Sequence, residues 1–176
     1  LIGQEACEEL SAGYDRDQFR SKIVMARHGF GSGEYKYYRY PLPSLIGELR
    51  QSLYEQLVPV ANDWQVRLGS PVRYPARLPD FLGQCHSAGQ LRPTPLILSY
   101  GPGDYNCLHQ DVYGETLFPI QVAVLLSSTA QFSGGEFILT EQRPRRQSRA
   151  QVVPLEQGDA VVFPVRDRPI NGTRGF

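Results

Sequence analysis

From Pro95 onward the chain is a series of short β-prone runs separated by turn residues, and this series most constrains the fold. The runs cover residues 96–100, 120–126, 136–140, 151–153 and 160–163. Glycine-containing turns lie between them at 101–103, 134–135 and 158–159. Strands this short with such turns predict antiparallel pairing.

The first half of the chain has the pattern of helices instead. Short helices are predicted at 4–10 and 78–88, and a long one begins at Ser44, a residue that can cap it, and ends near Gly69. Between the helix at 4–10 and the helix that begins at Ser44, a strand start at 22–25 and a turn at 29–33 lead into the tyrosine-rich strand 34–40. Helices followed by antiparallel strands predict an α+β domain whose strands form a jelly roll.

Length and composition indicate the class of protein but do not identify a binding partner. With 176 residues, the chain is long enough for one domain with a substantial core. Eighteen basic residues balance eighteen acidic ones, so net charge neither supports nor excludes nucleic acid. No apolar run reaches membrane-spanning length, and the N-terminus does not have the pattern expected of a secretory leader. The sequence indicates no protein partner. Cys7, Cys85 and Cys107 show no metal or redox spacing, which favours a reducing compartment and hence the cytoplasm.

The tripeptide His109-Gln110-Asp111 carries the clearest chemistry in the chain. An imidazole and a carboxylate two residues apart form the local part of a 2-His-1-carboxylate triad, which holds Fe(II) and leaves positions open for other ligands. If the pair lies at a strand end, both side chains share a face and can converge on one ion. Cys107 is expected to be a small buried thiol, not a ligand.

Residues 98–111, with Tyr100, the turn Gly101-Pro102-Gly103 and then His109-Gln110-Asp111, resemble the metal-binding strand of AlkB-type 2-oxoglutarate/Fe(II) oxygenases. Residues 134–137 and 157–163 resemble later strands of the same double-stranded β-helix, a cupin-like jelly roll. Nearly the whole chain, including 25–31, is similar to a bacterial family of AlkB relatives assigned by prediction to oxidative demethylation of damaged DNA bases. The resemblance implies one oxygenase domain over 1–176, with supporting helices and a substrate lid in 1–94 and the jelly-roll core in 95–176.

The resemblance also implies roles for single residues. His109 and Asp111 would be the catalytic and metal-binding residues for Fe(II), and Tyr100 would donate its hydroxyl to 2-oxoglutarate, with O₂ as the co-substrate. Leu98 stands where AlkB itself has an Asn, so it offers no polar group to the co-substrate. In such enzymes the second His and the Arg for the co-substrate carboxylate follow later in the chain, so the resemblance implies that both lie beyond Phe176. His28 and His86 are not natural replacements, since both precede the barrel strands.

In AlkB-type enzymes, the segments before the barrel hold a flipped base against aromatic side chains. The corresponding candidates for binding alkylated DNA or RNA here are Arg27, His28, Tyr35 and Tyr37. The alternative is that the alternate tyrosines pack on the helices. Arg143, Arg145, Arg146 and Arg149 form a second candidate, either for phosphate contact or as a solvated loop.

Three functions remain open at this point. The first is an Fe(II)/2-oxoglutarate dioxygenase that dealkylates damaged nucleobases, as in DNA repair. The second keeps the cofactors but hydroxylates a protein side chain or a small molecule. The third is a jelly-roll binding module without catalysis.

Overall fold

The helices predicted from the sequence form close to their predicted ends in the computed structural model, which describes residues 1–143 and 145–171. They are α1 (Gln4–Ala12), α2 (Ser44–Arg67) and α3 (Leu78–Ser87). The capping role predicted for Ser44 is wrong. Ser44 is already helical, and Pro43 holds the cap position with φ −52° and ψ 143°. The fixed φ of the proline ring leads the chain into the helix without a side-chain cap.

The strands are short and all their pairings are antiparallel. The tyrosine-rich segment forms β3, which ends at Tyr38 instead of Tyr40. A two-residue strand that the sequence did not predict precedes it, and a second one, β5, follows the Gly101-Pro102-Gly103 turn. The strands are β1 (Phe19–Val24), β2 (Gly31–Ser32), β3 (Glu34–Tyr38), β4 (Leu96–Ser99), β5 (Tyr105–Asn106), β6 (Ile120–Val124), β7 (Phe137–Glu141), β8 (Arg149–Val153) and β9 (Ala160–Pro164).

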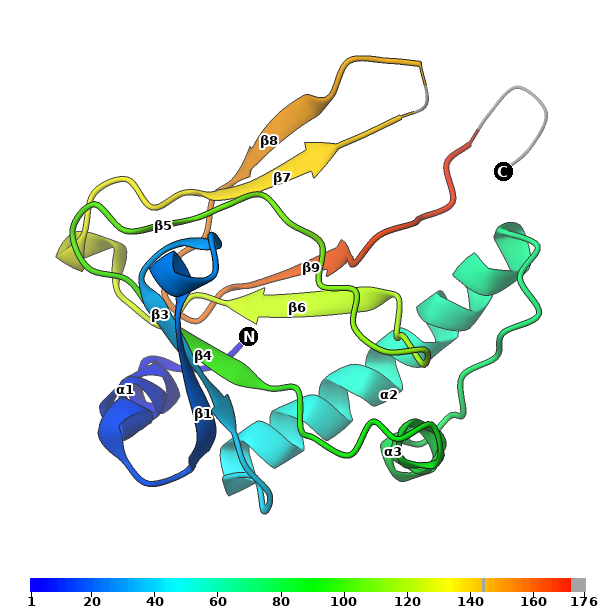
Figure 1. Cartoon of the computed structure of the whole chain (residues 1–176), viewed down its shortest axis with the longest axis horizontal. Helices are drawn as coiled ribbons and strands as arrows, with labels where there is room; N and C mark the ends of the chain where they lie inside the picture. Colours follow the sequence, from blue (N-terminus) through cyan, green and yellow to red (C-terminus); the bar gives the residue numbers. More distant parts are fainter. Residues whose placement is uncertain (144, 172–176) are drawn as a thin grey trace.

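These strands form four separate sheets, with the orders β1-β3-β4, β2-β5, β6-β9 and β7-β8. The α+β class is therefore confirmed. The jelly roll is not, because the described strands close no barrel. One part of the topology is nested, since β6 pairs with β9 while the β7-β8 hairpin lies between them in sequence. In Figure 1 this hairpin stands away from the helices, while α2 runs along the other side of the β6-β9 pair.

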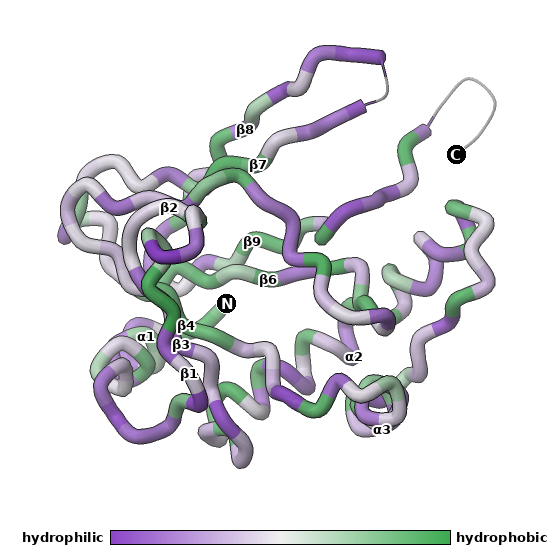
Figure 2. The backbone as a smooth tube through the Cα atoms, viewed as in Figure 1, coloured by the Kyte–Doolittle hydropathy of each residue, from purple (hydrophilic) through white to green (hydrophobic). Residues whose placement is uncertain are grey.

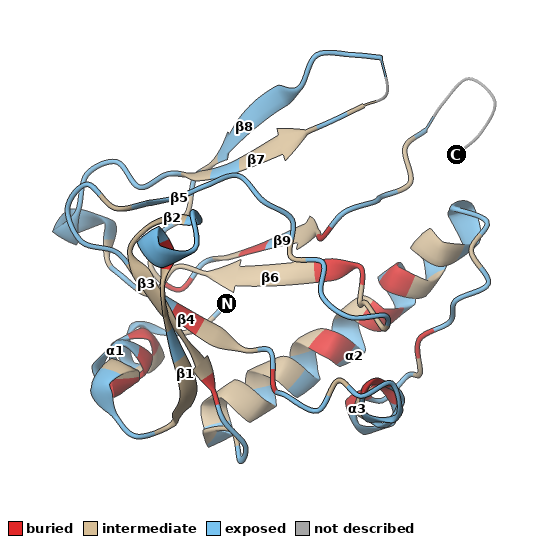
Figure 3. Ribbon diagram, viewed as in Figure 1, coloured by how far each residue is buried: buried red, intermediate tan, exposed pale blue. Residues whose placement is uncertain are grey.

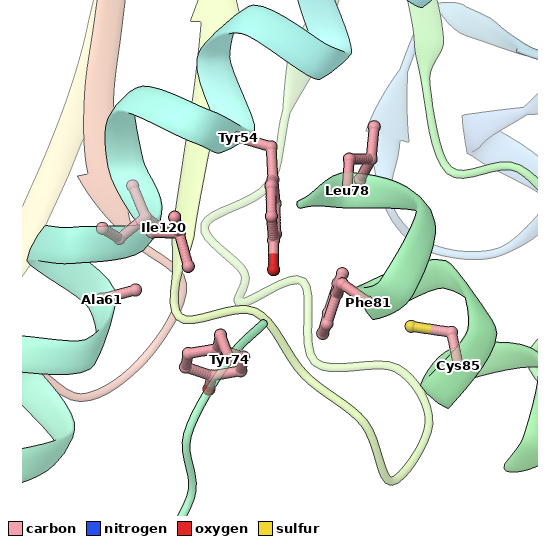
Figure 4. Packing of buried hydrophobic residues seen from close by; sticks show 8 residues of the cluster. Tyr54, Ala61, Tyr74, Leu78, Phe81, Cys85 and Ile120 are labelled. Atoms are coloured by element: carbon pink, nitrogen blue, oxygen red, sulfur yellow. The ribbon is translucent and has the colours of Figure 1, made fainter. Parts of the chain in front are cut away.

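The hydrophobic core cluster joins α2 and α3 to the start of β6 (Figure 4). Tyr54 of α2 stacks on Phe81 of α3 with ring centroids 5.4 Å apart, and Phe118 packs against both rings. The Tyr54 hydroxyl donates to the Pro75 carbonyl at 2.6 Å, so its polar end is satisfied inside the cluster. The cluster includes Ile120, which fixes the position of β6 against the helices.

No helix in the described part of the chain is both long enough and apolar enough to cross a lipid bilayer.

Candidate functional site

The segment that carries His109 and Asp111 is positioned by the short β2-β5 pair. Gly31 pairs with Asn106, and the Cys107 amide then donates to the Phe30 carbonyl at 2.9 Å. Gly31 has φ +121°, and a Cβ there would lie 2.2 Å from the Tyr105 carbonyl oxygen. Only glycine therefore allows the two backbones to approach this closely.

His109 and Asp111 lie in the loop after β5, so their predicted position on a strand is wrong. They converge nonetheless, with His109 Nε2 3.4 Å from Asp111 Oδ1. A hydrogen bond at 2.7 Å joins His109 Nδ1 to the Cys107 carbonyl oxygen. A carbonyl can only accept, so Nδ1 is the donor in this hydrogen bond, and Nε2 is the ring nitrogen that lies toward Asp111. The loop backbone, not strand alternation, brings the two groups together.

Gln121 was not singled out from the sequence, yet it orients the carboxylate. Its amide nitrogen, on β6, donates to Asp111 Oδ2 at 2.8 Å. The contact leaves Asp111 Oδ1 on the side of His109. The one sequence signal was a polar side chain inside the apolar run 120–124. Since the core cluster holds β6 in place through Ile120, the helices indirectly position this carboxylate.

Tyr100 directly follows β4, and its ring lies against Gly33, which directly precedes β3. A Cβ at Gly33 would be only 2.8 Å from the Tyr100 ring. Partial burial raises the pKa of the Tyr100 phenol, and a hydrogen bond with Asn106 acts in the opposite direction. The phenol therefore stays a hydrogen-bond donor at neutral pH. No contact within the described residues joins it directly to His109 or Asp111.

Tyr35 and Tyr37 lie on one face of β3, close enough for the charge of Asp111 to act on both phenols. Their rings meet edge to face at 5.5 Å, while Lys36 between them faces the other way, 3.9 Å from the Tyr14 ring centroid. Burial is the main cause that raises the pKa of both phenols, to about 12 for Tyr37, and the negative charge of Asp111 adds to the rise. The carboxylate of Asp111 therefore acts electrostatically on both tyrosines.

Arg27 and His28 lie farther out, on an exposed turn after β1. The His28 ring stacks on Phe30 with centroids 5.3 Å apart and an interplanar angle of 23°. Neither side chain contacts His109, Asp111 or the two tyrosines among the described contacts. The structure thus brings Tyr35 and Tyr37 to the carboxylate and leaves Arg27 and His28 at the periphery.

The loop around the pair is open to solvent (Figure 3). Cys107 is exposed, so its predicted burial is wrong, because it lies in the solvent-exposed loop after β5, where only its backbone amide is tied to Phe30 by a hydrogen bond in the described residues. Within residues 1–143 and 145–171, no group of three or more His, Cys, Asp or Glu side chains is placed to hold a metal ion. The described residues thus contribute two ligand-type groups, and the expected His and Arg beyond Phe176 stay a prediction.

Comparisons with known proteins identify the relatives of the chain. Residues 33–176 match a protein family described as an oxygenase catalysing oxidative methylation of damaged DNA. Two proteins from strains of Mycobacterium tuberculosis, both named as uncharacterized, are each 49% identical to it over 137 residues. The match covers 77% of this chain and 59% of the length of each relative. No solved structure matches the chain.

Proposed function

Because this chain belongs to the oxygenase family associated with damaged DNA, we propose that it forms part of an Fe(II)- and 2-oxoglutarate-dependent dioxygenase that removes alkyl groups from nucleobases. The observation that carries the proposal is the His109–Asp111 pair. Its imidazole is held in one tautomer by the Cys107 carbonyl, and its carboxylate is oriented by Gln121. Such outer contacts are typical of metal ligands.

The donor set fits Fe(II) as far as the described residues go. An imidazole nitrogen and a carboxylate oxygen, 3.4 Å apart, are two of the three protein groups that a facial triad requires. Their exposed fractions, 48% and 32%, leave room for a co-substrate and a substrate beside them. Iron and 2-oxoglutarate, when bound, supply the activation of O₂.

The protein residues position the reactants. His109 and Asp111 would hold the metal, and the Tyr100 phenol, protonated at neutral pH, would donate a hydrogen bond to a carboxylate of 2-oxoglutarate. Tyr35 and Tyr37 form an apolar, aromatic wall beside Asp111 against which a flipped base stacks.

The reaction places one oxygen atom of O₂ in a C–H bond of the N-alkyl group, while the other oxidises 2-oxoglutarate to succinate and CO₂. The hydroxylated carbon is bonded to both nitrogen and oxygen, so its C–N bond breaks and an aldehyde leaves with the alkyl carbon. The base nitrogen takes up the proton that the hydroxyl group loses. Oxidation of a methylated base thus removes the methyl group, and we interpret the family description in this sense.

Succinate formation by the whole protein tests the proposal. We expect Fe(II)-dependent conversion of 2-oxoglutarate to succinate that is stimulated by N-methylated oligonucleotides, together with release of formaldehyde. Stimulation by peptides or small metabolites instead would favour a hydroxylase of another substrate. No succinate with any of these additions would leave the binding-module hypothesis.

Gln121 supplies a first prediction about the metal. Replacing it by alanine removes the donor to Asp111 Oδ2, so the carboxylate is free to rotate away from His109. Loss of such an outer contact typically lowers metal affinity by about 10–100-fold. We expect this loss for the Gln121→Ala variant in Fe(II) or Mn(II) titrations of the whole protein.

The matched control is Gln51→Ala, which removes an exposed amide that donates to Glu55 at 3.1 Å on α2. It should leave the metal affinity unchanged. Equal affinities in the wild-type protein and the Gln121→Ala variant would contradict a role of Gln121 in orienting the ligand.

A further inference from the structure

The β7-β8 hairpin concentrates positive charge in a chain whose formal net charge is zero. Its loop, β8 and position 168 after β9 provide five arginines, three of which (Arg143, Arg149 and Arg168) act on a single carboxylate, Glu141. In Figure 2 the outer part of this hairpin is strongly hydrophilic. We call the five residues the arginine cluster: Arg143, Arg145, Arg146, Arg149 and Arg168.

Glu141 binds two arginines of the cluster, but its single negative charge does not balance the positive charge of the cluster. Arg143 donates to Glu141 Oε1 from Nε at 3.1 Å and from Nη2 at 2.9 Å, and Arg168 Nη2 donates to the same oxygen at 2.5 Å. The Arg143 hydrogen bond is the main cause that lowers the pKa of the Glu141 carboxyl, and the charges of Arg168 and Arg149 lower it further. One negative charge thus faces several positive ones.

Three members of the cluster are exposed and form no ion pair among the described residues, although the charge of one of them, Arg149, still acts on Glu141 across the β7-β8 pair. The three are Arg145, Arg146 and Arg149. Arg145 has φ +61°, a rare backbone conformation for a residue with a side chain, at the point where the hairpin turns. Like charges held close together repel, and a polyanion that bridges them relieves this repulsion.

A continuous set of contacts joins the base of the hairpin to the metal-binding pair. Phe137 at the start of β7 packs on Phe163 of β9 with centroids 5.4 Å apart, and Phe163 pairs with Gln121 of β6. Gln121 in turn donates to Asp111. The arginine cluster is therefore carried by an element anchored beside the proposed catalytic site.

We propose that the arginine cluster binds the phosphodiester backbone of the DNA strand whose damaged base is oxidised at His109 and Asp111. Guanidinium groups match phosphate oxygens with paired, charge-assisted hydrogen bonds, and arginine is the residue best suited to this contact. Arg143 and Arg168 are held by Glu141, whereas Arg145, Arg146 and Arg149 are free to reach phosphates. The inference rests on the proposed function for the identity of the strand, but its test does not require catalysis.

The test measures binding of the whole protein to a fluorescently labelled, undamaged single-stranded DNA oligonucleotide over a range of salt concentrations. Removing three phosphate contacts reduces the magnitude of the slope of log K against log salt by about 2, since each contact contributes about 0.7 on single strands. We therefore expect the Arg145→Gln/Arg146→Gln/Arg149→Gln variant to lose about 2 from this slope and to bind at least roughly tenfold more weakly at 0.1 M salt.

Two matched variants separate position from charge. Arg16→Gln/Arg77→Gln/Arg92→Gln removes the same charge from exposed side chains elsewhere and should keep most of the slope. Arg145→Lys/Arg146→Lys/Arg149→Lys keeps the charge and should restore most of the binding. An unchanged slope in the hairpin glutamine variant, or an equal loss in the control, overturns the inference. Absence of succinate with intact salt-dependent binding overturns the proposed oxygenase and not the arginine cluster.

Discussion

Replacing Asp111 by alanine is expected to abolish Fe(II) binding and succinate formation while leaving the fold intact. The carboxylate is one of two ligand-type groups in the candidate site, and its Oδ1 lies 3.4 Å from His109 Nε2. Loss of an outer contact already costs about 10–100-fold in metal affinity, so loss of a ligand should exceed about 100-fold. Metal titration and single-turnover succinate assays on the whole protein measure the effect.

The fold should tolerate this change because Asp111 lies in an exposed loop and its partner Gln121 can turn to water. Thermal unfolding should therefore stay close to that of the wild-type protein. Asp63→Ala, which removes an exposed carboxylate paired with Arg67 on α2, is the matched control and should keep full activity. Retention of both metal binding and succinate formation by Asp111→Ala would refute the proposed site.

The second large effect, a loss of stability, is expected from Gly31→Ala. Gly31 is far from Asp111 in sequence, but it pairs with the strand that leads into the Asp111 loop. The new Cβ would lie 2.2 Å from the Tyr105 carbonyl oxygen, in a backbone conformation with φ +121°. Backbone strain of about 1–3 kcal/mol adds to an overpacking cost of about 1–3 kcal/mol. We expect chemical denaturation to show a loss of about 2–6 kcal/mol in the free energy of unfolding, or the β2-β5 pair to separate.

Gly29→Ala separates the two contributions. Gly29 also has a positive φ, +70°, but a Cβ there meets nothing within 4 Å. It should therefore cost only about 1–2 kcal/mol of strain. If the β2-β5 pair positions His109, then Gly31→Ala should weaken metal binding more than Gly29→Ala does, even where both proteins are folded. Equal metal affinities in the two variants would contradict this coupling.

The sequence predicted most of the secondary structure because the patterns involved are local. The helical spacing of apolar residues from Leu45 to Val60 predicted α2, and the proline and glycine residues bounded the strands after Pro95. The predicted ends differ from the observed ones by a few residues at most elements, since tertiary contacts decide where pairing stops. The α+β class follows from the same patterns.

The candidate site was predicted only in part. His109 and Asp111 were chosen for their chemistry, and the structure brings them together, but through a loop instead of a strand. Gln121 was missed because a single glutamine in an apolar run has no distinctive pattern. The pairing of Gly31 with Asn106 was missed as well, since a contact between residues 75 positions apart leaves no local signal.

The sequence by itself determined the order and type of the helices and of the longer strands, the two ligand-type residues and the excess of arginine between β7 and β8. These properties depend on residue chemistry and on spacings within one helix turn or one strand. Only the tertiary structure decided that Tyr35 and Tyr37 lie close enough to Asp111 for its charge to act on them, that Gln121 orients the carboxylate and that Glu141 gathers Arg143 with Arg168. Each of these contacts joins side chains from different elements or loops, and their distances are set by packing across the whole chain.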